Sequence, residues 1–387
     1  MRYKYFLFVS VVLLGLASCK PKQEQRSLLL EGGTIIKVDP GKPDDNISIF
    51  DYFSKIEIIP LENSEDALLN TDRVKFRASG NQFYFLDELN NVIHVFNLDG
   101  ALMHRNNKNG RGPGEFLMST SLDINPYTNN LEVLNPAGAI YIYDSLGVEY
   151  IDKIEIFFPI GIHAIHEMSI LSSDRYIFFS RSDSEKNLFY YNATDNTHNS
   201  FDYDFPEFFN QLGTMTSNHF YHYKDTLRYY EGHNGNVWNV DTESNMLIPA
   251  YKWDFGEYTF DLSYIEEGQS IQYYVMTGMR LSTKYASPII EYTETEQFLI
   301  MRYKYKGVWK TAIYDKVNHS TKTFARTTEG VMFAPKTIMC GDELYMHAAA
   351  KYISLLVNDK VLDQKNREIL KKIHDEDNDV IIKYTLK

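Results

Sequence analysis

Short apolar runs of five or six residues recur along the chain, and most of them come in pairs separated by a turn. Phe83–Asp87 is followed by Val92–Asn97, and Leu131–Asn135 by Ala139–Asp144. Runs of this length that are rich in aromatic and β-branched residues, with turn residues between them, predict β-hairpins. Further runs of this kind are Tyr176–Ser180 with Leu188–Asn192, Leu227–Glu231 with Asn236–Asn239, Phe298–Arg302 with Lys310–Asp315, and Glu343–His347.

The pairs repeat at an even spacing. The second runs of the first four pairs end at Asn97, Asp144, Asn192 and Asn239, which are 47, 48 and 47 residues apart. Such a step holds about four strands with their turns, and this period is typical of a β-propeller blade. A β-sandwich would not keep so even a spacing over so many strands. The six units therefore predict an all-β fold, a six-bladed β-propeller with four-stranded antiparallel blades.

Two segments depart from the repeat. Residues 257–283 lengthen the step to the fifth pair and predict a helical insertion, whereas residues 360–376 have apolar positions at helical spacing and predict an amphipathic helix on the last blade. Apolar runs also occur at Ile56–Leu61 and at Val380–Leu386. If these two runs pair in one blade, the ring is closed and an open sheet edge is removed.

The N-terminus has the pattern of an export signal. Arg2 and Lys4 precede an apolar run that is too short to persist as a membrane-spanning helix, so residues 1–18 are expected to be a signal peptide. Leu16-Ala17-Ser18-Cys19 resembles the bacterial lipobox, in which the cysteine is acylated and becomes the mature N-terminus. An ordinary signal peptide with a nearby cysteine is the alternative. On the lipobox interpretation, residues 19–27 are the lipidated Cys19 with a polar tether, and residues 28–387 are the propeller.

Cysteine content and charge narrow the function classes. Acylation of Cys19 leaves Cys340 as the only thiol, so no intrachain disulfide is expected. The net charge of −13 becomes −15 when Arg2 and Lys4 leave with the signal peptide. Such a surface repels phosphate backbones and argues against nucleic acid as a partner. The expected location is the cell envelope, with the lipid in the outer membrane and the protein on its periplasmic or its surface face.

Residues 92–116 resemble an NHL-type repeat, through Phe96-Asn97-Leu98-Asp99-Gly100 and Gly110-Arg111-Gly112-Pro113-Gly114-Glu115-Phe116. With the lipobox, Ile58–Glu62 and Asp375–Asn378, nearly the whole mature chain is similar to the six-bladed β-propeller lipoproteins of Bacteroidota, although the later blades match only in pattern. This resemblance implies an architecture and an envelope location, and it implies no activity, because the members mostly lack an assigned one.

A polar residue ends the second strand of each predicted blade. Those ends lie on the face that carries the connections between blades, so six side chains would form a ring around one mouth of the axis, able to hold a sugar, a peptide terminus or a metal ion. The alternative is that strands end in polar residues because they meet water there. The ring consists of Asp87, Asn135, Ser180, Glu231, Arg302 and His347, with Arg111, Glu115, Arg181 and His233 in nearby loops.

No metal or cofactor is expected at this ring. Its mixed charges do not suit a dedicated metal site, and the histidines at 163 and 166, or at 219 and 222, are spaced to point to opposite faces of a strand. The loop Gly110–Glu115 lacks the Lys-Ser/Thr of a phosphate loop, so its glycines predict a tight crossing between blades.

Two functions from different classes remain open. The favoured one is a non-catalytic binding module of the envelope, for a glycan, a peptide or a protein partner. The alternative is a propeller enzyme that acts on a carbohydrate or a lactone at the axial mouth, with Asp87, Glu231 and His347 as the acid–base groups. Separately, Ser145 and Thr226 lie in Asp-Ser/Thr-apolar patterns that resemble Bacteroidota O-glycosylation sites.

Overall fold

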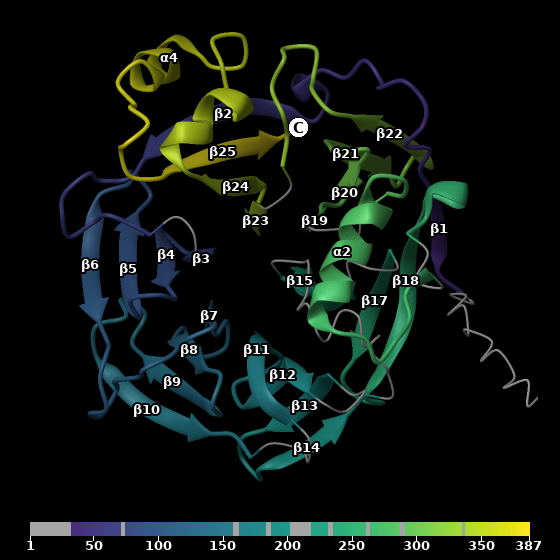
Figure 1. The fold of residues 1–387 in the computed structure, drawn as a ribbon. Helices are drawn as coiled ribbons and strands as arrows, with labels where there is room; N and C mark the ends of the chain where they lie inside the picture. The colour runs from purple at the N-terminus through teal and green to yellow at the C-terminus, as the bar shows by residue number, and fades with distance from the viewer. Residues whose placement is uncertain are drawn as a thin grey trace, which may run out of the picture.

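Six antiparallel sheets surround a common axis (Figure 1). The computed structural model describes residues 32–70, 74–157, 162–182, 187–201, 218–230, 235–260, 264–286, 291–334 and 337–387. One strand of each blade lies at the axis, and inner strands of neighbouring blades contact one another. The predicted six-bladed β-propeller is confirmed.

In each of the first five blades, four strands that are consecutive in the chain follow one another from the axis outward. Blade 1 comprises β3 (Val74–Ser79), β4 (Gln82–Asp87), β5 (Val92–Asn97) and β6 (Leu102–Asn107). Blade 2 comprises β7 (Ser121–Ile124), β8 (Leu131–Asn135), β9 (Ala139–Tyr143) and β10 (Tyr150–Glu155). Blade 3 comprises β11 (Ile162–Ile170), β12 (Arg175–Ser182), β13 (Leu188–Asn192) and β14 (Thr197–Ser200). Blade 4 comprises β15 (Phe220–Tyr223), β16 (Thr226–Tyr230), β17 (Asn236–Asp241) and β18 (Met246–Asp254). Blade 5 comprises β19 (Glu291–Glu294), β20 (Phe298–Tyr305), β21 (Val308–Asp315) and β22 (Ser320–Phe324).

Blade 6 combines one strand from the early part of the chain with three strands from its C-terminal part. It contains β23 (Thr337–Cys340), β24 (Glu343–Ala348), β25 (Val380–Leu386) and, outermost, β2 (Phe53–Pro60). β2 and β25 are antiparallel, and Ile58 lies opposite Ile382. The predicted closure of the ring by these two strands is therefore confirmed.

A fifth strand in blade 4 was not predicted. β1 (Thr34–Lys37) runs parallel to β18, with Ile36 opposite Trp253. Ile36 and Trp253 are both buried, so β1 contributes to the core. It also pairs with the outer edge of β18. An unpaired outer edge would be open to another chain, and β1 covers it.

The position of a strand in its blade explains its residue pattern. A middle strand packs against neighbouring blades on both faces, so β5 is buried at Val92–Phe96 and has no alternation. The outer strand β6 alternates between half-buried and exposed residues, because one of its faces meets water. Apolar clusters fill the spaces between blades, and the one between blades 1 and 2 includes Leu86, Phe116 and Tyr143.

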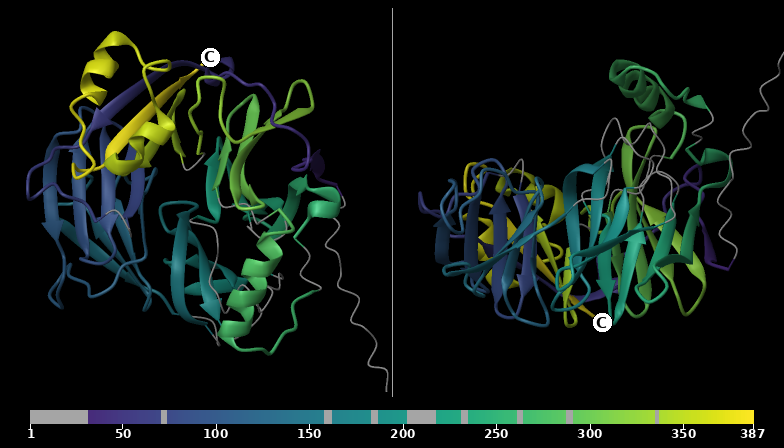
Figure 2. Two further views of the ribbon diagram at one scale, coloured as in Figure 1. Left: turned by 45° about the horizontal axis from the view of Figure 1, so that its top comes forward. Right: turned by 90° about the horizontal axis from the view of Figure 1, so that it is seen from below.

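Both predicted helical segments contain helices. α2 (Ile271–Ser282) lies within the insertion at 257–283, and Figure 2 shows it raised above one face of the ring. α4 (Gln364–Leu370) packs on β2, where Asn366 Oδ1 accepts the Ile58 amide at 2.9 Å. α4 is shorter than the predicted 360–376, because Asp363 caps its start and the turn from His374 to Asp377 follows soon after its end. Within the described ranges, the other helical segments are η1 (Ile49–Asp51), η2 (Gly256–Tyr258), η4 (Ala350–Tyr352) and α3 (Ile353–Leu356).

Candidate functional site

The glycine-rich loop between β6 and β7 folds around its own glutamate. The Glu115 Oε2 atom accepts a hydrogen bond from the Gly112 amide at 2.8 Å. A Cβ atom on Gly110 would overlap the same oxygen, and one on Gly112 would approach it to 3.0 Å. A side chain at position 110 would therefore displace the Glu115 carboxylate from its place in the loop.

The same loop is pinned against blade 2. Gly114 has a φ of +71°, and a Cβ there would come within 2.6 Å of the Tyr150 ring. The Tyr143 hydroxyl donates to the Gly114 carbonyl at 2.6 Å. At the end of the loop, the Phe116 amide donates to the Lys108 carbonyl at 2.7 Å, and Phe116 is buried. These glycines permit the tight crossing between blades 1 and 2, as predicted.

A cavity of about 610 Å³ lies between this loop and blade 2. Ligand sites in proteins commonly have volumes of this order. Its walls are the loop, the β8–β9 turn and the outer strands β9 and β10. The side chains used below are Arg111, Glu115, Asn135, Tyr141, Tyr150 and Lys153.

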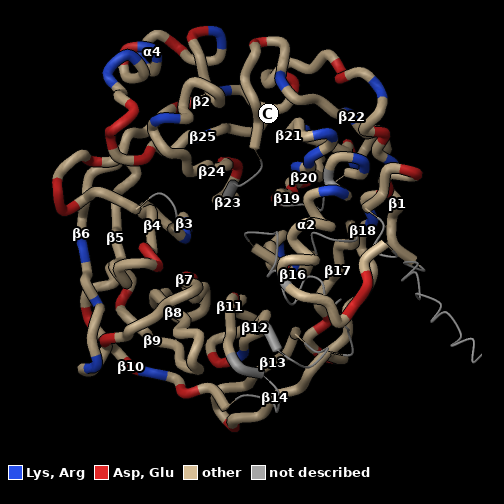
Figure 3. Tube along the Cα trace, viewed as in Figure 1, with Lys and Arg blue, Asp and Glu red and all other residues tan. Residues whose placement is uncertain are grey.

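Cations gather at this cavity although the chain is acidic. Arg111 and Lys153 are exposed, and Lys153 forms an ion pair of 2.7 Å with the exposed Glu155. Lys108 lies behind the loop, 4.9 Å from the centre of the Tyr143 ring, and burial lowers the pKa of its ammonium group. Elsewhere acidic and basic residues are interspersed around the ring (Figure 3).

The structure brings together three of the predicted site residues at this cavity, namely Arg111, Glu115 and Asn135. Asn135 ends β8 as expected, and its Oδ1 atom accepts the Ala137 amide at 2.8 Å within the turn. Sequence reasoning missed Tyr141, Tyr150 and Lys153, because nothing in their own pattern marks them as neighbours of the loop.

Asp87 ends its strand as predicted, and its carboxylate closes its own turn. The Oδ1 atom of Asp87 accepts the Leu89 amide at 3.0 Å and the Asn90 amide at 3.1 Å. Ser180, Arg302 and His347 do not end their strands, contrary to expectation, because β12 continues to Ser182, β20 to Tyr305 and β24 to Ala348. β20 is longer because its hairpin closes only at Lys306 and Gly307, both with positive φ.

The remaining ring side chains also have partners. The Ser180 hydroxyl donates to the Asn187 carbonyl at 3.1 Å. Arg302 pairs with Glu291 at 3.5 Å and lies 4.5 Å from the centre of the Trp309 ring. His347 contacts the buried Asp379 through Nε2. Glu231, His233 and the Arg181 side chain lie outside the described residues, so the ring as a binding site stays a prediction.

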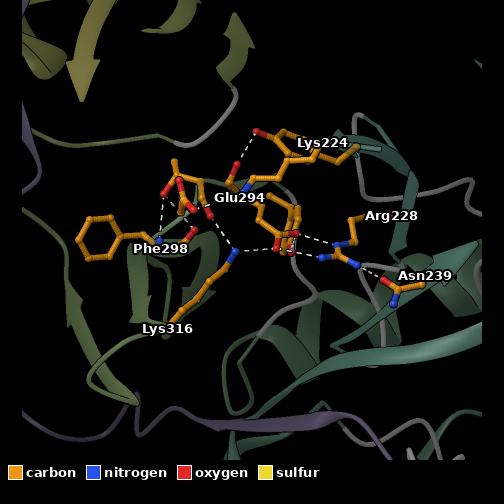
Figure 4. Close-up of polar contacts among 10 residues, drawn as sticks. Lys224, Arg228, Asn239, Glu294, Phe298 and Lys316 are labelled. Atoms are coloured by element: carbon orange, nitrogen blue, oxygen red, sulfur yellow. Dashed lines mark hydrogen bonds and ion pairs between the residues drawn. The ribbon is translucent and has the colours of Figure 1, made fainter. Parts of the chain in front are cut away.

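A buried ionic network joins blades 4 and 5 (Figure 4). Glu294, at the end of β19, receives two hydrogen bonds from Arg228 of β16, at 2.7 and 3.0 Å. Lys316 approaches the same carboxylate at 2.7 Å, and the Tyr292 hydroxyl donates to it at 3.0 Å. Burial alone would raise the pKa of Glu294, but Arg228 and Lys316 outweigh it and lower that pKa. Arg228 and Lys316 share this one carboxylate, and the network acts as a clamp between two blades.

The histidines of blade 4 bind separate partners on β11. The His219 ring contacts Glu167 at 2.7 Å, whereas His222 Nε2 lies 2.7 Å from the Ser169 hydroxyl. Within the described ranges, no three His, Cys, Asp or Glu side chains are grouped as metal ligands would be. No helix in those ranges is long and apolar enough to cross a bilayer.

Comparison with solved structures supports the fold. The chain is similar to a candidate exported protein of Bacteroides fragilis, with a TM-score of 0.70, 17% identity, and coverage of 92% of this chain and 100% of the other. It is also similar to a DUF4221 family member from Bacteroides vulgatus, with a TM-score of 0.50, 10% identity, and coverage of 87% and 97%. No curated protein sequence matches the chain. The sequence profile of one family, described as a domain of unknown function, matches residues 34–385, and the protein therefore belongs to the DUF4934 family.

Proposed function

We propose that this protein is a lipid-anchored binding module of the cell envelope that holds its ligand in the cavity over blade 2 without catalysing a reaction. The observation that carries the proposal is the cavity itself, about 610 Å³ in volume and walled by a loop that is braced on a rigid blade. Loops fixed on a rigid scaffold are where binding residues concentrate.

The bracing favours binding by a preformed site. Tyr143 holds Gly114, and the Asn91 side-chain amide donates to the Leu117 carbonyl at 3.0 Å, so the C-terminal part of the loop is tied to buried side chains. A site that is ordered before the ligand arrives does not have to lose conformational freedom on binding. The envelope location is supported by the resemblance of Leu16–Cys19 to a lipobox.

The second candidate is an enzyme acting on a carbohydrate or a lactone at the axial mouth. One observation favours it: the His347 ring is oriented by the buried Asp379 carboxylate, as a general base must be. Asp87 is engaged in its own turn, and Glu231 lies outside the described residues. Of the three expected acid–base groups, His347 is therefore the one that the structure places with an orienting carboxylate. Binding is the better-supported function.

Thermal unfolding of the full chain in detergent tests the proposal. The panel contains neutral and acidic oligosaccharides, peptides and Ca²⁺, and each mixture is also analysed for new products. A ligand that binds only the folded state should stabilise it by about 2.7 kcal/mol at a hundredfold excess over its Kd. We expect at least one panel member to raise the unfolding midpoint without being converted.

A blocking variant and its control locate the site. Ala137 is exposed and lines the cavity, so Ala137→Trp should fill the mouth and abolish the rise in midpoint. Ala101 is exposed in the β5–β6 turn on the opposite face, and Ala101→Trp should preserve the rise. A rise that survives Ala137→Trp would contradict the cavity as the site, and a product formed from a sugar or a lactone would favour the enzyme.

A further inference from the structure

The cavity over blade 2 contains two aromatic walls. Tyr141 and Tyr150 are half-buried, and each is supported from behind by another ring. The ring centres of Phe116 and Tyr141 are 5.3 Å apart, and those of Tyr143 and Tyr150 are 6.0 Å apart. Supported tyrosines offer contact area to a ligand at a small entropic cost, and each also carries a hydroxyl for hydrogen bonding.

Positive charge surrounds these rings. The exposed Arg111 and Lys153 lie on different walls, the first on the loop and the second on β10. Lys153 is paired with Glu155, but a pair between two exposed side chains contributes little, so Lys153 can exchange that partner for an anion. Arg111 presents a planar guanidinium group, which suits a carboxylate.

The one carboxylate that lines the cavity is already engaged by the loop. Glu115 accepts the Gly112 amide, and its charge helps to keep the half-buried Lys108 protonated. The carboxylate therefore offsets Lys108 behind the loop, while Arg111 and Lys153 remain at the cavity. This is a local basic site on a chain whose net charge is −13.

We propose that this cavity binds an acidic saccharide, with sugar rings against Tyr141 and Tyr150 and a carboxylate between Arg111 and Lys153. The inference rests on the proposed binding function and names its ligand class. A uronic acid residue combines an apolar C–H face of its sugar ring with a carboxylate. The first matches the tyrosine rings of the cavity, and the second matches its cations. Asn135 adds an amide group whose Oδ1 is held by the Ala137 amide, which leaves its Nδ2 atom to donate to sugar hydroxyls.

Calorimetric titration of the full chain in detergent tests this class of ligand. The probes are a galacturonic acid trimer and a neutral galactose trimer of the same length. We expect the acidic trimer to bind at least about tenfold more tightly than the neutral one, and its affinity to fall as salt is raised, because the distinguishing contacts are charged.

Charge removal provides the matched variants. The double variant Arg111→Ala with Lys153→Ala should lose about tenfold or more in affinity for the acidic trimer. Lys322 is an exposed lysine on β22, the outermost strand of blade 5, as Lys153 is on blade 2, and Lys322→Ala should keep the wild-type affinity. All three positions are exposed, so the thermal midpoints of the unliganded variants should match the wild type.

The outcomes separate this inference from the proposed function. Equal affinity for the two trimers, or wild-type affinity in the double variant, would overturn the acidic saccharide. Binding of a peptide but of neither sugar would overturn it as well, while the binding function would stand. If no member of the wider panel binds, the proposed function fails together with this inference.

Discussion

Glu132 is a buried carboxyl group that should make the stability of the fold depend on pH. It lies on β8, is 1% exposed, and accepts the Asn125 side-chain amide at 2.7 Å. Burial raises its pKa to about 7, and the Asn125 amide and the Tyr176 hydroxyl oppose that shift only in part. Between its ordinary pKa and pH 7, the folded protein therefore binds more protons than the unfolded chain, and stability falls as pH rises.

Glu132→Gln should remove this dependence. The amide carries no charge, so we expect the variant to be more stable than the wild type at pH 8, by about 1 to 3 kcal/mol, and similar to it near pH 4.5. Urea unfolding at both pH values measures the difference. Glu149→Gln, at an exposed position of the same blade, is the control and should change little at either pH. An equal effect of Glu132→Gln at both pH values would refute the assignment.

At the scale of elements, the stability of the ring depends on what joins one blade to the next. Strand pairing holds each blade together, but the described strands of one blade do not pair with those of another. Apolar clusters and a few buried polar contacts therefore hold neighbouring blades together. Glu294 of β19 with Arg228 of β16 is one such contact, and both side chains are buried. Breaking a buried pair leaves an uncompensated charge, which costs far more than losing an exposed pair.

We expect Glu294→Gln to lower the free energy of unfolding by about 3 to 5 kcal/mol. Lys316 shares the carboxylate, so the triple variant Glu294→Met with Arg228→Met and Lys316→Met should restore much of that loss. Because the pKa of Glu294 is lowered, the clamp should stabilise the fold above the ordinary pKa of a glutamate and fade as pH falls through the lowered value. Denaturant unfolding of the single and triple variants at several pH values measures both effects.

The exposed pair Lys224–Glu296 is a control between the same two blades, with an Nζ–Oε1 distance of 3.3 Å. Lys224→Ala should cost less than about 1 kcal/mol. If Glu294→Gln proves as mild as Lys224→Ala, the network does not clamp the blades.

At the scale of the whole molecule, the two ends of the described chain serve different blades. β25, near the C-terminus, completes blade 6 with β2. β1 ends 16 positions before β2 begins and lies at the outer edge of blade 4. The path from the proposed anchor at Cys19 therefore reaches the ring at blade 4 before it closes the ring at blade 6. In the sequence, β1 thus lies between the proposed anchor and the closing strands.

Cys19→Ser should abolish incorporation of a labelled fatty acid when the full chain is produced in a bacterial host, and should release the protein from the membrane fraction. Metabolic labelling and fractionation measure the two effects. Cys340→Ser is the matched control: Cys340 is a half-buried free thiol on β23, so the variant should keep its label. Label that persists in Cys19→Ser would contradict the lipid anchor.

Much of the fold was predictable from the sequence. The hairpins Phe83–Asn97 and Leu131–Tyr143 pair neighbouring segments, and strand pairing between close neighbours depends on local patterns of apolar and turn residues. The even spacing of the hairpins predicted the number of blades. The apolar runs Ile56–Leu61 and Val380–Leu386 predicted how the ring closes. Asp363 was a readable helix cap that would have corrected the start of α4.

What the tertiary structure alone decided is which side chains meet across blades and loops. Arg228 and Glu294 are 66 positions apart, and Arg111 shares a cavity with Lys153 only because the loop folds back over blade 2. β1 pairs with β18 although more than two hundred residues separate them. Such contacts depend on how whole blades pack around the axis. A local residue pattern specifies which segments become strands, and the packing of completed sheets specifies the neighbours of their side chains.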